Sequence, residues 1–235
     1  MDLKKPENIT ELLKSQRVLL RRYVKYMREL INRKYKNAAI LTYWLFDYLR
    51  YLQMEDTFNP RFNISYRRGQ IVYANFGYRI GSELGGCHYA IVLDVKNSKM
   101  NSQVTVVPLK SKREKETSYS ATYHVDIHSE IFRLLLNKAK EMHRREKENL
   151  AKDPAPSELK RIEKQLKLID DIIDFTQEKM NHSSVADLGQ ICTISKIRIV
   201  HPTKNRDPLA GIRLSKDSMD RIEDKLQFLF FLNKS

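Results

Sequence analysis

The chain has 235 residues, and its 43 Lys and Arg outnumber its 29 Asp and Glu, which gives a formal net charge of +14. This length allows one large or two small domains with a real hydrophobic core. The positive charge favours a partner that is RNA, DNA, an acidic protein or an anionic surface; the alternative is that the charge serves solubility alone. Two cysteines without a C-x-x-C pair indicate neither a disulfide framework nor a zinc knuckle, and with no signal-peptide pattern and no apolar stretch long enough to span a bilayer we expect a cytoplasmic protein.

Residues 8–55 are predicted to be helical. Apolar residues recur at helical spacing from Leu12 to Leu30 and again from Ile40 to Leu49, with a break expected near Lys36 and Asn37. The opposite face of the first helix is strongly basic, which is typical either of a solvated face or of a surface that contacts phosphate or an acidic partner. We expect residues 1–58 to form an N-terminal helical extension, which Asn59-Pro60 ends.

A glycine-rich loop follows, between the first two of three predicted strands. Runs of Val and Ile predict these strands at about 70–76, 88–94 and 103–109. Five of the seven glycines fall between Gly69 and Gly86, and glycine supplies positive φ and close backbone approach. The loop carries Glu83, and Cys87 and His88 come just after it. Loops on a rigid scaffold often carry the chemistry, so this one is a candidate functional site.

The middle of the chain alternates between strand and helix patterns. A polar loop is predicted over 110–120 and a strand from Tyr119 to Ile127. Helical periodicity on both sides of the turn Asp153–Pro156 predicts a helical hairpin over residues 129–181. This hairpin stands between strand-like blocks, so we expect it to project outside the sheet core as a solvated embellishment, a dimerisation arm or a docking surface. A further strand is expected within Leu188–Val200, and a closing helix over Leu214–Asn233.

The order of these elements resembles the MazF/PemK/Kid family of toxins, small RNA-cleaving proteins from toxin–antitoxin modules. Five segments match the family in its order, which makes a fairly specific signal: Arg68–Val72, Gly81–Gly86, Tyr89–Leu93, Val104–Ser111 and Gln190–Lys196. The resemblance implies an α+β fold: a small SH3-like antiparallel β-barrel with N-terminal helices, an inserted helical hairpin and a C-terminal helix. The barrel domain would span residues 64–235, interrupted by the insertion at 129–181.

The resemblance also implies an activity. Family members cleave single-stranded RNA without a metal or cofactor, through attack of a ribose 2′-OH on the adjacent phosphate. A cognate antitoxin protein and a homodimer would be the partners, with no membrane involved.

Four residues are the catalytic candidates. His88 stands where the family commonly carries an arginine on the scissile phosphate; an imidazole can donate to phosphate or move protons, or can be a structural residue. Glu83 is a base, a brace for the loop or an exposed turn carboxylate. Lys110 takes a position where many members have Thr, with Ser111 beside it; a lysine there can neutralise charge on a phosphorane, or can merely begin a polar loop. The candidates for RNA contact are Arg68, Ser82, Lys112, Gln190, Thr193, Arg17, Arg21, Arg22 and Lys25.

Besides His88 and Lys110, two further departures from the family leave the catalytic scheme open. Gly189 stands where some relatives carry a carboxylate, and Cys192 where they carry an arginine. A non-catalytic module that binds RNA or an acidic protein therefore stands as the alternative, whereas a DNA-binding regulator lacks a recognition-helix signature. His124 and His128 are four residues apart but have no accompanying carboxylate motif, so no metal site is predicted.

Overall fold

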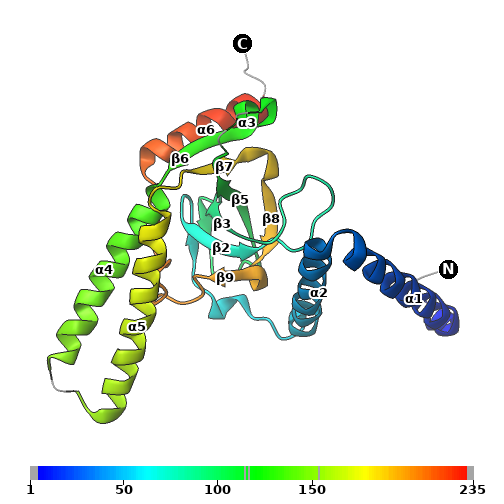
Figure 1. The fold of residues 1–235 in the computed structure, drawn as a ribbon, viewed down its shortest axis with the longest axis horizontal. Coiled ribbons are helices and arrows are strands. Elements are labelled where there is room, and N and C mark those ends of the chain that lie inside the picture. The colour runs from blue at the N-terminus through cyan, green and yellow to red at the C-terminus, as the bar shows by residue number, and fades with distance from the viewer. Residues whose placement is uncertain (1–4, 114, 116, 153, 232–235) are drawn as a thin grey trace. The chain divides into compact units, whose positions relative to one another are not determined.

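The computed structural model describes residues 5–113, 115, 117–152 and 154–231. The chain divides into two compact units, one ending at Met54 and one beginning at Glu55, here called the N-terminal unit and the sheet unit (Figure 1). Along the described chain, helices and strands alternate and every paired strand runs antiparallel, so the fold is α+β. None of the described helices is long and apolar enough to cross a membrane.

The N-terminal unit is built from two helices, as the apolar spacing predicts. A short turn, η1 (Pro6–Asn8), leads into α1 (Ile9–Arg33), and α2 follows (Tyr35–Glu55). The break falls at Lys34, slightly earlier than expected, where the backbone leaves helical geometry at φ −149° and ψ 68°. Leu30, Ala38 and Leu41 are buried near this break. Most other side chains of α1 are exposed, including the basic residues Arg17, Arg21, Arg22 and Lys25.

One bent antiparallel sheet organises the sheet unit. After η2 (Pro60–Phe62), its strands are β2 (Ile71–Asn75), β3 (Cys87–Val92), β5 (Gln103–Ser111), β6 (His124–His128), β7 (Ser184–Asp187), β8 (Cys192–Ser195) and β9 (Ile199–His201). They pair in the order β6-β7-β5-β3-β2-β9, and β8 also pairs with β5. The short strands β1 (Tyr66–Arg67) and β4 (Lys96–Asn97) pair separately.

The long strand β5 changes partner at Pro108. Residues Gln103–Val106 pair with β8, whereas Leu109–Ser111 pair with β7. Proline has no N–H to donate, so it suits the point where one ladder ends and the next begins. This change of partner places the carboxyl end of β5, with Lys110 and Ser111, beside β7 rather than β8.

Side chains alternate between two hydrophobic clusters along the central strands. Ile71, Ile91 and Val107 belong to one cluster, and their neighbours Val72, Val92 and Val106 belong to the other. This alternation is what the period of two of a β-strand requires when both sides of a sheet are covered. The first cluster is completed by the helix α6 (Lys216–Phe230), through Met219 and Ile222. The predicted end of this helix, Asn233, lies outside the described residues.

One strand prediction needs correction. Tyr119–Ile127 is not one strand, because a short helix, α3 (Ser118–Tyr123), precedes β6. Thr117 starts this helix with a capping box: its Oγ1 accepts from the Ser120 N–H at 3.1 Å, and the Ser120 Oγ accepts from the Thr117 N–H at 2.5 Å. The strand expected within Leu188–Val200 is confirmed as β8, with the turns η3 (Leu188–Gln190) and η4 (Lys196–Arg198) on either side of it.

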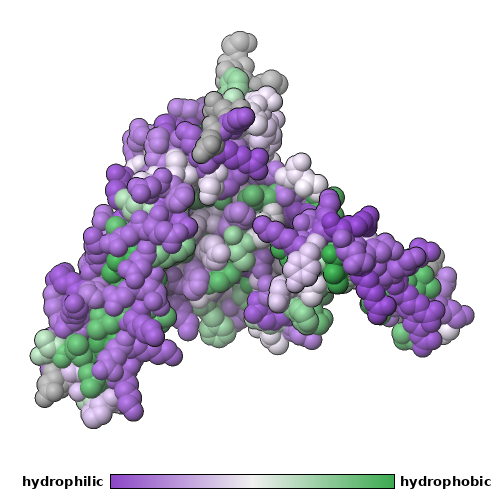
Figure 2. Space-filling view, viewed as in Figure 1, coloured by the Kyte–Doolittle hydropathy of each residue, from purple (hydrophilic) through white to green (hydrophobic). Residues whose placement is uncertain are grey.

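Residues 129–181 contain the two predicted helices, α4 (Glu130–Leu150) and α5 (Pro156–Lys179); of the predicted turn, Asp153 lies outside the described residues. The outer part projects from the sheet, and in Figure 2 apolar side chains gather between helices that are otherwise mostly hydrophilic on the face shown. The base, however, is part of the core. Ile131 and Leu135 belong to the first cluster, and Phe132 packs edge-on to Tyr89. The expectation that the whole hairpin lies outside the core is wrong, because the first turns of α4 pack into the first cluster.

Candidate functional site

A polar cavity of about 750 Å³ opens at the carboxyl end of β5. The glycine-rich loop from Ser82 to Gly85 forms one wall, and α3 with the start of β6 forms another. Lys110 and Ser111 lie at the end of β5, and Lys112, Arg113 and Lys115 continue the lining with three further basic side chains. Asp187 and Gln190 complete it from β7 and η3. Cations, a carboxylate and an imidazole therefore converge here from segments far apart in the sequence.

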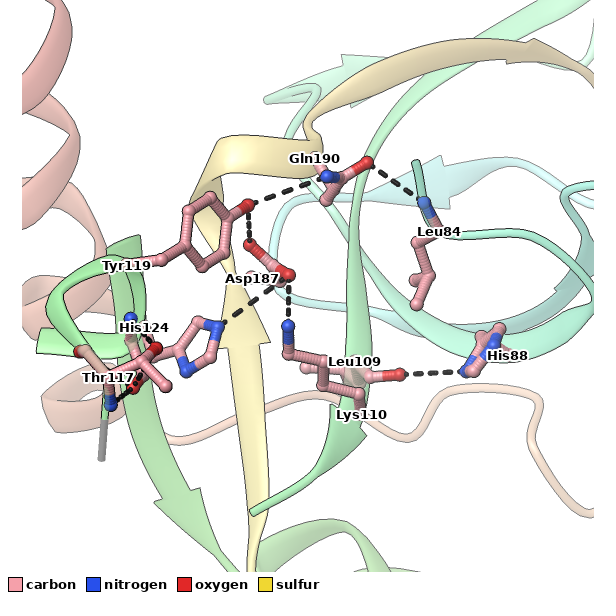
Figure 3. A network of polar contacts seen from close by, with 10 residues as sticks. Leu84, His88, Leu109, Lys110, Thr117, Tyr119, His124, Asp187 and Gln190 are labelled. Atoms are coloured by element: carbon pink, nitrogen blue, oxygen red, sulfur yellow. Dashed lines mark hydrogen bonds and ion pairs between the residues drawn. The ribbon is translucent and has the colours of Figure 1, made fainter. Parts of the chain in front are cut away.

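Asp187 is the centre of the polar network drawn in Figure 3. Its side chain is only 1% exposed and accepts two hydrogen bonds, from Lys110 Nζ to Oδ2 at 2.6 Å and from the Tyr119 hydroxyl to Oδ1 at 2.8 Å. The same ammonium lies 5.4 Å from the centroid of the Tyr119 ring. A carboxylate so deeply buried needs such donors, because an unpaired charge in the interior is costly.

His124 lies directly opposite Asp187 in the β6–β7 ladder. Its Nε2 is 3.7 Å from Asp187 Oδ2, and the side chain is 15% exposed. Burial lowers the pKa of His124 below its ordinary 6.5, and the positive charges of Lys110 and Arg113 lower it further, while Asp187 opposes them. These effects favour the neutral imidazole, the form that can accept a proton.

Gln190 joins this network to the glycine-rich loop. Its Oε1 accepts a hydrogen bond from the Leu84 N–H at 3.1 Å, and its Nε2 makes a long contact of 3.5 Å with the Tyr119 hydroxyl. The preceding Gly189 leaves room for this arrangement, because a Cβ at that position would lie 2.4 Å from the Tyr119 hydroxyl oxygen. Gly189 stands where the family resemblance implies a carboxylate in some relatives, and the absence of a side chain there is a packing requirement of the Tyr119–Asp187 contact.

His88 does not line the cavity and instead holds the loop to the sheet. Its Nδ1 is 3.2 Å from the Leu109 carbonyl oxygen and its Nε2 is 3.0 Å from that of Gly85. Both partners are acceptors, so the ring is occupied on both sides by backbone contacts. This geometry makes His88 a brace between the glycine-rich loop and β5.

Several predicted residues do meet at the cavity. Glu83 lies on its wall, 56% exposed, with Oε2 3.7 Å from Arg79. Ser82, Lys110, Ser111 and Gln190 are also brought to it. Lys112 lines it as well, but its Nζ donates to Asp126 Oδ2 at 2.5 Å.

Other predicted residues lie elsewhere. Arg68 pairs with Glu223 at 2.6 Å and donates to the Leu93 carbonyl, away from the cavity lining. Thr193 lies on β8, where its Oγ1 is 3.0 Å from that of Thr105. The basic residues of α1 belong to the N-terminal unit. Among the described residues, no group of three or more His, Cys, Asp and Glu side chains is arranged to hold a metal ion.

Three residues of the network were not predicted from the sequence as site residues: Tyr119, His124 and Asp187. The sequence pattern places Tyr119 in a strand, and it presents His124 only beside His128, as a pair without a carboxylate motif. Asp187 lies two residues before Gly189, where some relatives carry a carboxylate. The hairpin separates β6 from β7 in the sequence, so no local pattern could bring His124 and Asp187 together. One signal was available, the helix-capping pair Thr117 and Ser120 that starts α3.

An antiparallel sheet that gathers lysines, an arginine, a buried carboxylate and an imidazole around one polar cavity is typical of a protein that binds polyanions. The comparisons with known proteins agree with this class. A family model described as the PemK-like, MazF-like toxin of type II toxin–antitoxin systems matches residues 67–230, more than half of the chain, and the chain belongs to that family. A search of curated proteins gave no match.

Proposed function

We propose that this chain is a toxin-like endoribonuclease that binds single-stranded RNA in the cavity beside β5 and cleaves it there without a metal. The observation that supports this best is the convergence of Lys110, Asp187 and His124 on one basic cavity in a member of the PemK-like family. In the reaction, a base takes the proton of a ribose 2′-OH, and its oxygen attacks the adjacent phosphorus. The bond to the 5′-oxygen breaks, that oxygen takes a proton from a general acid, for which Glu83 is a candidate, and the products are a 2′,3′-cyclic phosphate and a 5′-OH end.

The cations of the cavity supply phosphate binding. Lys110, Arg113 and Lys115 line it together with Lys112. Positive charge in a cavity raises the local concentration of a polyanion and stabilises the extra charge of a phosphorane. Ser111 adds a hydroxyl beside Lys110. Glu83 remains a proposed acid–base group at the cavity wall. His88, which the sequence also suggested as an acid–base group, remains a candidate, although its ring contacts the carbonyl oxygens of Leu109 and Gly85.

The family also suggests partners and a finer description of the fold. We propose that the bent sheet, in which β5 pairs with β3, β7 and β8, is an SH3-like barrel. A homodimer and a cognate antitoxin that covers the basic cavity with an acidic segment fit the same reading. The cavity offers such a segment the lysines that would otherwise bind phosphate.

Cleavage of a long single-stranded RNA by the purified chain, with EDTA present, tests the proposal. We expect fragments with cyclic phosphate and 5′-OH ends. Lys110→Met should lower the rate by about 10²–10³-fold, as for loss of a transition-state donor. The matched control is Lys204→Met, which removes an exposed lysine outside the cavity lining and should leave the rate unchanged. RNA binding without cleavage would instead identify a non-catalytic binding module.

A further inference from the structure

The cavity contains a buried polar atom whose partner is close but not bonded. Within the described part of the chain, His124 Nε2 has no hydrogen-bond partner although it is inaccessible to solvent. The nearest carboxylate oxygen, Asp187 Oδ2, is 3.7 Å away, beyond hydrogen-bond distance. That same oxygen accepts the hydrogen bond from Lys110 at 2.6 Å. The lysine and the imidazole thus face one carboxylate oxygen, and in this structure the lysine holds it.

We propose that His124 is the general base of RNA cleavage and that binding of the RNA phosphate brings Asp187 to it. The inference rests on the proposed function. When a phosphate oxygen accepts the hydrogen bond of Lys110, Asp187 Oδ2 loses that donor. It then accepts a hydrogen bond from a proton on His124 Nε2 instead. The nitrogen that remains, Nδ1, then accepts the proton of the 2′-OH as its oxygen attacks phosphorus. The imidazolium formed carries that proton, and Asp187 stabilises it as a positioning residue.

The charges around the ring support this order of events. His124 faces Lys110 on β5, Arg113 on the following loop, Asp187 on β7 and the edge of the Tyr119 ring on α3. Burial and the two cations lower the pKa of His124, so before RNA binds the base is unprotonated and ready. A phosphate paired with Lys110 and Arg113 offsets those cations and makes the ring more basic at the moment it must accept a proton.

Tyr119 keeps Asp187 in place during this exchange. Its hydroxyl donates to Oδ1, the oxygen that Lys110 does not use, and Gln190 and the ring of Tyr123 pack beside it. One carboxylate oxygen stays fixed while the other changes partner. The movement required is small, because Oδ2 already lies 3.7 Å from Nε2.

The change in the pKa of His124 on RNA binding can be measured without cleavage, by NMR titration of the histidine rings in the full chain. Free His124 should titrate below its ordinary pKa of 6.5. A 2′-O-methyl RNA oligonucleotide, which cannot be cleaved, should raise this pKa, and Asp187→Asn should abolish the rise. His124→Gln identifies the signal. A His124 pKa that the oligonucleotide leaves unchanged or lowers would overturn the exchange of partners.

The catalytic step is tested by single-turnover cleavage. His124→Ala should lower the rate by about 10²–10⁴-fold, and free imidazole should restore part of it with the pH dependence of a base. His201→Gln is the matched control, because His201 also pairs with a carboxylate, Asp207, but lies outside the cavity lining. If the wild type cleaves RNA and His124→Ala is equally active, the role of His124 as the base is overturned and the proposed function stands. A wild type that binds RNA and does not cleave it would overturn the proposed function and this role with it. If His124→Ala fails to fold, the wild-type titration still decides the exchange.

Discussion

Lys110 and Asp187 lie on neighbouring strands with Nζ and Oδ2 2.6 Å apart, and the carboxylate is 1% exposed while the lysine side chain is 23% exposed. The pair joins the carboxyl end of β5 to the end of β7, and Tyr119 and His124 both lie beside it. The same lysine lines the cavity in which we propose that RNA phosphate binds, so in this proposal one side chain serves both stability and function.

Removing only the lysine should destabilise the sheet unit. Lys110→Met leaves a buried carboxylate with Tyr119 as its remaining close donor, and we expect a loss of about 1–3 kcal/mol, below the value for a fully buried pair because Lys110 is partly solvated. The double variant Lys110→Met/Asp187→Asn should recover part of it. Urea unfolding of the single and double variants measures both, and additive effects would mean that the pair does not couple.

Gln190 should control the order of the glycine-rich loop. Gln190→Leu removes the acceptor of the Leu84 N–H, so exchange of that amide with solvent should speed up by about tenfold, the equivalent of one ordinary hydrogen bond. Gln190→Glu keeps an acceptor and should preserve most of the protection. Gln177→Leu, an exposed change on α5, is the control. Unaltered exchange at Leu84 would show that the loop is held by other contacts.

Asp126 should make stability depend on pH in the acid range. Burial would raise the pKa of Asp126, but bonds from Lys112, from the His128 N–H and from Ser183 together lower it below its ordinary 3.8. A carboxyl whose folded pKa is depressed stabilises the protein above the unfolded pKa, and this stabilisation is lost as pH falls through the folded value. Asp126→Asn should therefore lower Tm at pH 6 and flatten its decline below about pH 4. Parallel curves for the two proteins would contradict this.

Glu130 should be a major anchor of α6. Its buried carboxylate accepts from the Ser215 N–H at 2.6 Å and from the Ser218 hydroxyl, so it caps that helix from the start of α4. Glu130→Ala should cost about 2–3 kcal/mol, because charge-assisted bonds from the Ser215 N–H and the buried Ser218 hydroxyl are lost. Glu148→Ala, which breaks an exposed pair with Arg144, should cost about 0.5 kcal/mol or less. Equal losses in urea unfolding would argue against the cap.

The basic face of α1 should contribute to RNA binding through charge. If Arg17, Arg21 and Arg22 each contact a phosphate, changing all three to Gln should reduce the slope of log affinity against log salt by about 2, at roughly 0.7 per contact. Changing the exposed residues Lys160, Lys164 and Lys167 of α5 to Gln removes the same charge and serves as the control. Equal slopes for the two triple variants would assign the face of α1 to solvent or to a protein partner.

Local patterns were sufficient for much of the fold. Apolar spacing predicted the helices of the N-terminal unit and of the hairpin, and the Val- and Ile-rich runs predicted β2, β3 and β5 within a few residues. These signals depend on the periods of helix and strand, which the sequence carries directly. The segments from Arg68 to Ser111 and around Gln190 also indicated the family that the comparison found.

The tertiary structure alone decided which chemical groups meet. Thr117 and Ser120 turn a tyrosine-rich segment into α3, Pro108 transfers the end of β5 to β7, and the hairpin returns the chain so that Asp187 lies opposite His124. The contacts of Asp187 with Lys110 and His124 join strands distant in sequence, and their energy depends on burial that no single segment possesses. His88 shows the converse: its neighbours in sequence suggested chemistry, whereas its ring nitrogens face two backbone carbonyls supplied by the fold.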